Sequence, residues 1–382
     1  MIERTSTQPT ATAAVFEGPE RISVRDVEIP VLGPAEMIVE IDISGVDGSE
    51  VHQYLGEFEW LNERAPVIFG DEIIGRVVAS GNLVREQRGL EIGDRVTVEA
   101  RWSCAECYPC MRGQYYLCES GAFQEGYGTT SLTRHGTLWG GYATHLFVPA
   151  AATVHRVPDA LDDRSALVAS SVLANGIAWT DAAGVTVGTR IAIIGPGPQG
   201  LACALAAWVA GAEVVLVGVS GDAQRLQAVV TTSIRTVALT DPGDLNISVA
   251  QLDGGSNFDA VIETAGTPSA KALSQNLVRT MGTIVNVSVA APAVQTIDWV
   301  AMLMKQVTIK SVVSHPNSVV RSFDLALDLQ SRGFDLADWV THTFSLHEAE
   351  KALRTAGYLT SERPVKTVII PRMDDAGTPS QT

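Results

Sequence analysis

Four of the five cysteines lie close together, with the spacing C-x2-C-x2-C-x7-C. They are Cys104, Cys107, Cys110 and Cys118. Four thiolates on one short loop can close a tetrahedral zinc site with no open position, which is the arrangement of a structural zinc. An iron–sulfur cluster is the competing use of four cysteines, but the trailing proline of its common framework is missing. The spacing therefore predicts a structural zinc lobe over about residues 101–120.

A second chemical motif is the glycine-rich stretch that follows the apolar segment RIAII. Gly195, Gly197 and Gly200 have the spacing G-x-G-x-x-G, and an apolar helical segment follows them. The first glycine permits a tight turn, the second lets the backbone approach a pyrophosphate, and the third lets helix and strand pack closely. With Pro198 and Gln199 between the last two glycines, the loop predicts a dinucleotide site at a helix N-terminus.

The end of the next apolar strand indicates which dinucleotide would bind. An acid at this point would hold the ribose 2′-hydroxyl of NAD, but the sequence has Ser220 there and Arg225 five residues later. A small neutral residue with a nearby arginine leaves room and charge for a 2′-phosphate, so we favour NADP(H) over NAD(H). Two alternatives stay open, because Asp222 could reach a ribose and Arg225 could be a solvated helix residue.

The elements that must position these residues fall into two patterns. Residues from about 13 to 150 form short apolar or alternating strands separated by glycine and proline, which is typical of a partly open β-barrel. From about 161 onward, helical segments alternate with Val- and Ile-rich strands, which indicates a parallel sheet covered on both faces. The sequence thus predicts an α/β protein with two domains, as its length of 382 residues also suggests.

Composition excludes several classes of function. The formal charge of −16 opposes the phosphate neutralisation that nucleic-acid binding needs, so we expect neither a nucleic-acid nor an anionic-membrane partner. The longest apolar tract contains Gly211 and Glu213, which suits a buried helix and strand better than a membrane span. Without a recognisable secretory signal we expect a cytoplasmic protein, in which Cys203 would be a small buried apolar residue.

Taken together, these motifs resemble the medium-chain dehydrogenase/reductase superfamily, of the zinc-containing alcohol, polyol and threonine dehydrogenase type. The resemblance covers nearly the whole chain. It implies a GroES-like catalytic domain over 1–160 and 315–382 and a Rossmann cofactor domain over 161–314. It also implies a homodimer or homotetramer joined through the Rossmann domain, and hydride transfer between the nicotinamide and a small organic substrate.

The resemblance also assigns roles to individual positions. In GVDGSEVH, Asp47 stands where the family usually has a zinc-binding cysteine, and Ser49 and His52 match its proton relay. In GDE, Asp71 replaces the ligand histidine and Glu72 matches the family's glutamate. Two further positions come from the segment SSVLAN. They are Ser171, at the third zinc-ligand position, and Asn175, beside the nicotinamide.

The three substituted positions make a catalytic zinc doubtful, because zinc prefers nitrogen and sulfur ligands and tolerates a single carboxylate. Two close aspartates repel each other, so Asp47 or Asp71 should hold a proton to a higher pH. A neutral carboxylic acid could then protonate a carbonyl oxygen or the α-carbon of an alkene. The alternative is that both acids are ion-paired or solvated, in which case His52 is an ordinary loop histidine.

The leading prediction is an NAD(P)-dependent oxidoreductase acting on an alcohol or ketone, or on an activated C=C or C=N bond. Loss of the metal would favour the latter, since conjugate reduction needs less polarisation of an oxygen. Two alternatives are a cofactor-binding protein that has lost redox chemistry and a non-redox enzyme on the same scaffold. The sequence does not name the substrate.

Overall fold

The computed structural model describes most of the residues of the chain. They are residues 9–120, 125–134, 137–240, 252, 257–289, 294–315 and 317–373. The chain divides into two compact units. The first consists of Met1–Leu167 with Val340–Thr382, and the second of Val168–Trp339.

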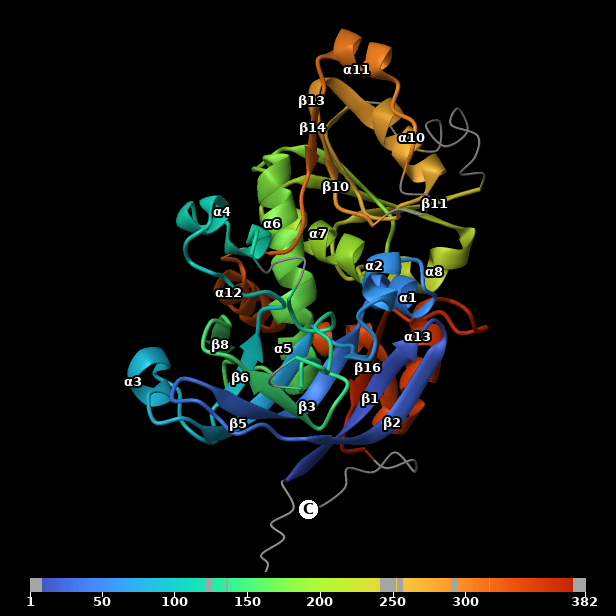
Figure 1. The fold of residues 1–382 in the computed structure, drawn as a ribbon. Helices are drawn as coiled ribbons and strands as arrows, with labels where there is room; N and C mark the ends of the chain where they lie inside the picture. Colours follow the sequence, from blue (N-terminus) through green and yellow to red (C-terminus); the bar gives the residue numbers. More distant parts are fainter. Residues whose placement is uncertain are drawn as a thin grey trace, which may run out of the picture. The chain divides into compact units, whose positions relative to one another are not determined.

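The first unit contains two sheets of mostly antiparallel strands (Figure 1). The larger sheet has the order β15-β16-β3-β5-β6-β8, with β7 also paired to β3, and the smaller has the order β2-β1-β4. The strands are β1 (Thr10–Gly18), β2 (Arg21–Glu28), β3 (Met37–Val46), β4 (Val67–Ile68), β5 (Ile73–Ser80), β6 (Arg95–Val98), β7 (His145–Val148), β8 (Val154–Arg156), β15 (Val340–Ser345) and β16 (Lys366–Ile370). Short strands separated by glycine-rich turns are typical of the partly open β-barrel that the sequence predicts.

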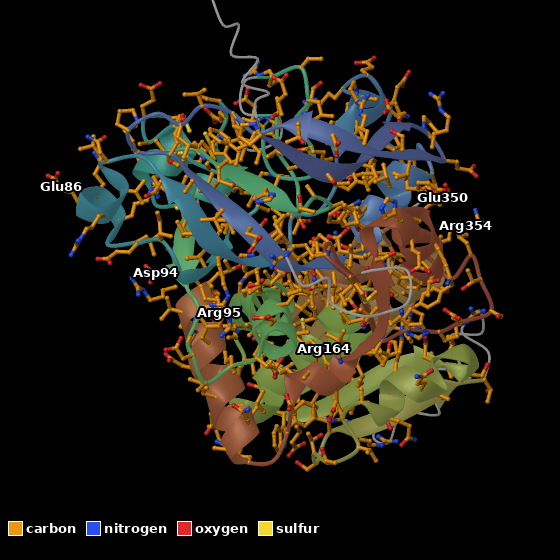
Figure 2. The ribbon with its side chains drawn as sticks, turned by 90° about the horizontal axis from the view of Figure 1, so that it is seen from below. Glu86, Asp94, Arg95, Arg164, Glu350 and Arg354 are labelled. Atoms are coloured by element: carbon orange, nitrogen blue, oxygen red, sulfur yellow. The ribbon has the colours of Figure 1, made fainter. Side chains whose placement is uncertain are left out.

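Short helices connect these strands. They are α1 (Gly48–Tyr54), α2 (Glu59–Asn62), α3 (Val84–Arg88), α4 (Tyr108–Met111), η1 (Tyr115–Leu117), α5 (Asp163–Leu167), η5 (Leu346–Glu348) and α13 (Ala349–Ala356). Charged side chains such as Glu86 on α3 and Glu350 on α13 are exposed on the outside of the unit (Figure 2). The side chain of Arg95 is instead buried, with 9% of it exposed. Its Nε lies 2.8 Å from Oδ1 of Asp163, and this ion pair links β6 to α5.

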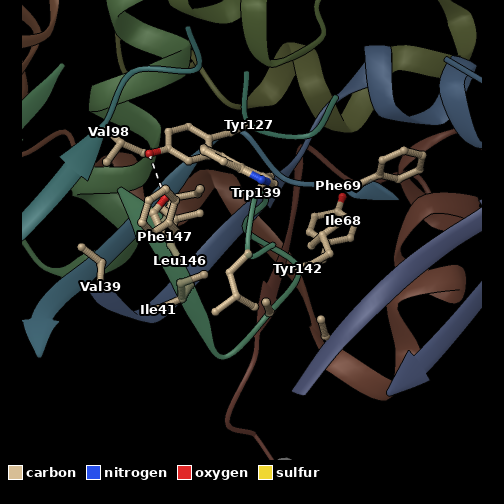
Figure 3. Packing of buried hydrophobic residues seen from close by; sticks show 14 of the residues in the cluster. Val39, Ile41, Ile68, Phe69, Val98, Tyr127, Trp139, Tyr142, Leu146 and Phe147 are labelled. Carbon is tan, nitrogen blue, oxygen red and sulfur yellow. Dashed lines mark hydrogen bonds between the residues drawn. The ribbon is translucent and has the colours of Figure 1, made fainter. Parts of the chain in front are cut away.

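Aromatic side chains from distant segments form much of the core of the first unit (Figure 3). The Trp139 ring meets the edge of Phe147 with a centroid distance of 5.0 Å, and the buried Tyr127 hydroxyl donates to the Phe147 carbonyl over 3.3 Å. Phe16 and Phe69 stack at 4.8 Å. This packing fixes the loop around residues 126–128, which borders Asp71.

The second unit is a six-stranded sheet with the order β11-β10-β9-β12-β13-β14. Every described pair in it is parallel, and its strands are β9 (Arg190–Ile194), β10 (Glu213–Val219), β11 (Arg235–Leu239), β12 (Phe258–Glu263), β13 (Val278–Asn286) and β14 (Thr308–Ser311). The helical segments are η2 (Val168–Leu173, a π-helix), α6 (Ala174–Ala183), α7 (Pro198–Val209), η3 (Ser220–Asp222), α8 (Ala223–Gln227), α10 (Pro268–Leu277), α11 (Trp299–Lys305), α12 (Val319–Ser331) and η4 (Leu336–Trp339). This is the doubly wound Rossmann arrangement, with a change of strand order next to β9.

The division into units differs from the sequence-based boundaries at both ends of the second unit. Residues 161–167 belong to the first unit, and residues 315–339 belong to the second. Helix α12 packs against η2 and α6, and its Arg321 pairs with Asp181 of α6 at 2.6 Å. The Trp179 indole also donates to the Ser314 carbonyl over 3.1 Å. An amphipathic pattern alone did not indicate which unit this helix covers.

In the part of the chain that the structure describes, no helix combines the length and the apolar character that crossing a membrane requires.

A buried ion pair joins the last strand of the first unit to its N-terminal half. Lys366 on β16 lies 2.5 Å from Oε2 of Glu72, with side-chain exposures of 2% and 3%, and it also donates to the Val46 carbonyl over 3.0 Å. Replacing the lysine alone would leave a carboxylate in the core without its partner.

We therefore expect Lys366→Met to lower the free energy of unfolding by about 3–5 kcal/mol. The matched control is Lys351→Met, because Lys351 pairs with Glu348 at the surface and its loss should cost less than about 1 kcal/mol. Urea unfolding of both variants makes the comparison. An equal loss in the two would contradict the buried-pair argument, and Glu72→Gln combined with Lys366→Met should recover part of the loss.

Candidate active site and metal site

The first acidic residue of the predicted site caps a helix. Asp47 follows β3 and is the N-cap of α1, where its Oδ1 accepts the Glu50 backbone N–H over 2.8 Å. The Glu50 carboxylate accepts the Asp47 N–H in return over 3.1 Å, which completes a capping box. The Ser49 hydroxyl donates to the same Asp47 carboxylate, 2.9 Å from Oδ1. Local sequence therefore fixes the direction of the Asp47 side chain.

Glu50 is the buried centre of this arrangement, and the sequence analysis did not select it. Its side chain also accepts the Gly70 N–H over 2.7 Å and the Tyr142 hydroxyl over 2.6 Å. Burial and the Asp47 carboxylate raise the pKa of Glu50 well above its ordinary value. Glu50 thus connects the helix that carries Asp47 to the loop that carries Asp71. An acid three residues after a possible N-cap was the available signal.

Asp71 lies close to these acids, just before β5. It follows Gly70, whose φ of +99° suits glycine, and a Cβ there would meet the Gly141 backbone at 2.6 Å. Burial first, and then the charge of Asp47, raise the pKa of Asp71 to about 7, while the cations of Arg101 and Lys366 oppose the rise. Asp71 is therefore a carboxyl group that changes protonation near neutral pH.

Arg101 is a cation that interacts electrostatically with Asp71 and Asp47, and it was also missed from the sequence. Its Nη1 donates to the carbonyls of Ala100 and Tyr127, each over 3.1 Å. Burial lowers the pKa of the guanidinium group, and the carboxylates of Asp71 and Asp47 counteract that effect. The signal in the sequence was an arginine between an apolar strand and the cysteine lobe, but arginines at strand ends are usually solvated.

The described contacts separate the two residues of the predicted proton relay. His52 Nδ1 lies 2.7 Å from Oε2 of Glu57, and its ring lies 6.2 Å from that of Phe58. Ser49 instead bonds to Asp47. Among the described residues no hydrogen bond joins Ser49 to His52, so the relay stays a prediction.

The four cysteines of the lobe come together as the spacing predicts. Their sulfur atoms all lie within 4.8 Å of one another, with Cys110 on α4 and Cys118 just after η1. Backbone N–H groups of the loop point at these sulfurs, and the N–H of Glu106 is the main cause that lowers the pKa of Cys104 to about 6. Within the described part of the chain, this is the one group in which three or more Cys, His, Asp or Glu residues come close enough to hold a metal ion.

In the second unit, the three glycines have the geometry that a dinucleotide loop requires. Gly195 has a φ of +102° just after β9, and a Cβ on Gly200 would lie 1.8 Å from the Gly195 carbonyl oxygen. Gly197 is the N-cap of α7, with Pro198 in its first turn. The nearest atom to a Cβ on Gly197 would be Arg225 Nη1 at 4.0 Å, so the backbone there has open space. A phosphate can approach at this point.

Two amide oxygens on helices α6 and α7 are among the buried polar atoms that have no hydrogen-bond partner in the described part of the chain. They are Oδ1 of Asn175 on α6 and Oε1 of Gln199 in the first turn of α7. Unpaired buried polar atoms are uncommon, and a ligand that supplies donors would satisfy them. Together with the open glycine loop, they fit a bound dinucleotide. Ser171 lies half-buried in the π-helix η2, and its role as a third ligand position stays a prediction.

The residues predicted to select the cofactor lie where β10 ends. Ser220 is exposed at the start of η3, and Asp222 accepts the Val219 N–H over 3.0 Å. Arg225 Nη1 lies 3.7 Å from Oδ1 of Asp222 and 4.0 Å from the ideal Cβ position of Gly197. The Asp222 carboxylate is thus already bonded to the backbone, and the Arg225 cation lies beside the glycine loop.

Comparison with known proteins decides the family. Residues 33–159 match the model of the alcohol dehydrogenase GroES-like domain, and residues 198–329 match that of the zinc-binding dehydrogenase domain. A Mycobacterium tuberculosis protein described as an alcohol dehydrogenase is 33% identical over 72% of this chain and 74% of its own length. The chain belongs to the medium-chain dehydrogenase/reductase family.

Two further matches extend over almost the whole chain. A sorbitol dehydrogenase of Halalkalibacterium halodurans is 27% identical over 93% of this chain and 97% of its own length. A structure from Sinorhizobium meliloti, described as a zinc-binding dehydrogenase bound to NADP, is 26% identical, has a TM-score of 0.80, and covers 95% of this chain and 100% of its own. The predictions of the family and of the GroES-like and Rossmann folds are confirmed, and this medium-chain dehydrogenase is an NAD(P)-dependent oxidoreductase.

The sulfur cluster makes a direct prediction about metal content. We expect Cys107→Ser to lower the amount of zinc bound per chain and to lower the midpoint of thermal unfolding, because three thiolates and a hydroxyl bind zinc less tightly. The measurement is metal analysis by mass spectrometry alongside a thermal melt.

Cys203→Ala is the matched control, since Cys203 is fully buried in α7, outside the lobe. Its zinc content should equal that of the unmodified chain. Unchanged zinc in Cys107→Ser would contradict the assignment of the lobe.

Proposed function

We propose that this medium-chain dehydrogenase transfers hydride between NADP(H) and the carbonyl carbon, or activated alkene carbon, of a small organic substrate, with Asp71 as the proton donor in the direction of reduction. The observation that carries the proposal is the Asp71 carboxyl group, whose pKa of about 7 makes it partly protonated at neutral pH. A general acid is most effective when its pKa lies near the working pH.

A catalytic zinc of the usual kind does not fit the residues present. The Asp47 carboxylate already accepts hydrogen bonds from the Glu50 N–H and the Ser49 hydroxyl. Asp71 has the positive charge of Arg101 near it, which would repel a second cation. Two carboxylates and a hydroxyl in place of the nitrogen and sulfur ligands are also a poor set for zinc. The proposed reaction therefore uses no catalytic metal.

The dinucleotide, when bound, would supply or accept the hydride. Its pyrophosphate would be held by the backbone N–H groups at the start of α7, where Gly197 leaves space. The unpaired oxygen of Asn175 is suited to accept an amide N–H of the nicotinamide. Ser220 and Arg225 support the choice of NADP(H), because they offer space and charge for a 2′-phosphate.

The remaining parts of the proposal concern metal and assembly. We assign a structural zinc to the four cysteines, because their sulfurs match a closed tetrahedral site. We further propose a cytoplasmic homodimer or homotetramer joined through the Rossmann domains. Equilibrium sedimentation measures the oligomer, and a monomer at micromolar concentration would contradict that part.

The activity is tested with the purified chain, both reduced dinucleotides, and a panel of aldehydes, ketones and enones, by following the absorbance of the reduced nicotinamide. Metal analysis of the same preparation should give one zinc per chain. Two would contradict the absence of a catalytic zinc. Dinucleotide binding without turnover on any compound would favour a cofactor-binding protein that has lost redox chemistry.

Asp71→Asn tests the proton donor. In reduction the acid must be protonated, so kcat/KM should be constant at low pH and fall as the pH rises through about 7, where Asp71 ionises. The variant should lose on the order of 10²-fold in kcat/KM and should lose this pH dependence. Asp42→Asn is the matched control, because burial also raises the pKa of Asp42 but its partners are Arg76 and Arg372. A full rate with Asp71→Asn would end the proposal.

Arg225→Gln tests the cofactor. Without the guanidinium, the KM for NADP(H) should rise by about tenfold or more, while that for NAD(H) should change little, because only NADP(H) carries the 2′-phosphate. Arg332→Gln is the control, since Arg332 pairs with Asp328 on the surface of α12. A preference of the unmodified chain for NAD(H) of tenfold or more would remove the NADP claim.

A further inference from the structure

We propose that Arg101 is a catalytic residue, and that its guanidinium group binds the substrate oxygen on which negative charge develops. This inference rests on the function proposed above, and it names the group that supplies the positive charge which a catalytic zinc supplies elsewhere in the family. It also restricts the substrate to compounds with a carbonyl or conjugated carbonyl oxygen, because the oxygen on which negative charge develops must contact the guanidinium group.

The Arg101 side chain is held by the backbone rather than by a carboxylate. Its Nη1 makes both of its described hydrogen bonds, to the carbonyls of Ala100 and Tyr127. Within the described part of the chain, its Nε and Nη2 have no hydrogen bond, and neither Asp47 nor Asp71 forms a direct ion pair with it. The cation is therefore fixed at one end and keeps donors for a ligand at the other.

The loop around residues 126–128 brings this cation and Asp71 to the same place. On one side, a Cβ on Gly126 would lie 2.2 Å from Nη1 of Arg101, so the guanidinium packs directly on the glycine backbone. On the other side, a Cβ on Gly128 would lie 3.5 Å from the Gly70 nitrogen and 4.0 Å from the Asp71 Cβ. Between them, Tyr127 is locked into the core and supplies the carbonyl that Arg101 binds.

The charges around the site favour this use of the cation. Asp47 and Asp71 both stabilise the charged form of Arg101, whereas burial and the nearby Arg64 oppose it. Lys366 is committed to Glu72 and to the Val46 carbonyl, so it is not available to a ligand in the same way. Within the described part of the chain, Arg101 is thus a cation that interacts with both acids and still has donors without a hydrogen bond.

The reduction then balances with the groups present. NADPH, when bound, would supply the hydride to the substrate carbon and leave as NADP⁺, and the π electrons of the C=O bond would move to oxygen. Arg101 stabilises the charge that develops on this oxygen, and Asp71 gives up its proton to it, forming the O–H bond and a carboxylate. With a conjugated substrate the proton goes to the α-carbon instead. Removing one such preorganised donor commonly costs on the order of 10²–10³-fold in rate.

The test uses the full chain and the substrate that the panel above identifies. Arg101→Ala should lower kcat/KM by on the order of 10²–10³-fold. Guanidinium chloride at millimolar concentration should restore at least about tenfold of this loss, because it replaces the missing cation, whereas urea, which has a similar shape and no charge, should restore none. If the Arg101 side chain only held the loop in position, guanidinium and urea would have the same effect on kcat/KM of Arg101→Ala.

Arg88→Ala is the matched control. Arg88 is likewise partly buried and bonded through its guanidinium to two backbone carbonyls, those of Pro149 and Ala150, and no catalytic acid is its partner. Its kcat/KM should stay close to that of the unmodified chain, with no response to guanidinium. NADPH affinity, measured by fluorescence titration, should be unchanged in both variants.

The role of Arg101 and the proposed function can each be contradicted by a different result. A kcat/KM for Arg101→Ala within threefold of the unmodified chain, or equal effects of guanidinium and urea, would overturn the role of Arg101 while leaving the oxidoreductase intact. If Arg101→Ala does not fold, Arg101→Lys and Arg101→Gln are compared instead. Arg101→Lys keeps the positive charge, so it should retain at least about tenfold more activity than Arg101→Gln. Absence of NADPH binding by the unmodified chain would instead overturn the proposed function.

Discussion

The constraint on which the first unit depends is the crowding of carboxylates where β3 and β5 meet. Strand β3 leads directly into Asp47 and Glu50, and the segment before β5 brings Asp71 and Glu72 to the same place. Four carboxylates without compensation would repel one another and would lose hydration on burial. The structure compensates each in a different way, and these differences decide what each residue can do chemically.

Glu72 is neutralised by the buried Lys366, and Glu50 is bonded to backbone N–H groups and the Tyr142 hydroxyl. Both are therefore supports rather than reactive groups. Asp47 is held as a helix cap. Asp71 has a pKa of about 7 and interacts with the charge of Arg101, whose described hydrogen bonds go to backbone carbonyls. In the proposed reaction, a proton from Asp71 and the guanidinium group of Arg101 take the place of a catalytic metal.

The second unit satisfies a different requirement, which is close approach of backbone to ligand. The turn at Gly195 and the contact between Gly200 and the Gly195 carbonyl leave no room for side chains, and Gly197 leaves its space open. These are steric facts about three positions, so they are visible in the sequence. The unpaired oxygens of Asn175 and Gln199 are not, because only the packing around them reveals that no donor among the described residues reaches them.

The sequence by itself determined the elements and motifs that depend on local spacing: the parallel Rossmann sheet, the glycine loop, the cysteine lobe and the altered GVDGSEVH and GDE segments. Only the tertiary structure decided the partners of the charged groups, because these come from residues far apart in the chain. Lys366 meets Glu72 across 294 positions, Tyr142 meets Glu50 across 92, and Arg101 binds the Tyr127 carbonyl beside Asp71. Residue type determines which side chains can carry a charge. Their protonation state and their availability to a ligand depend on the burial and the neighbours that folding supplies.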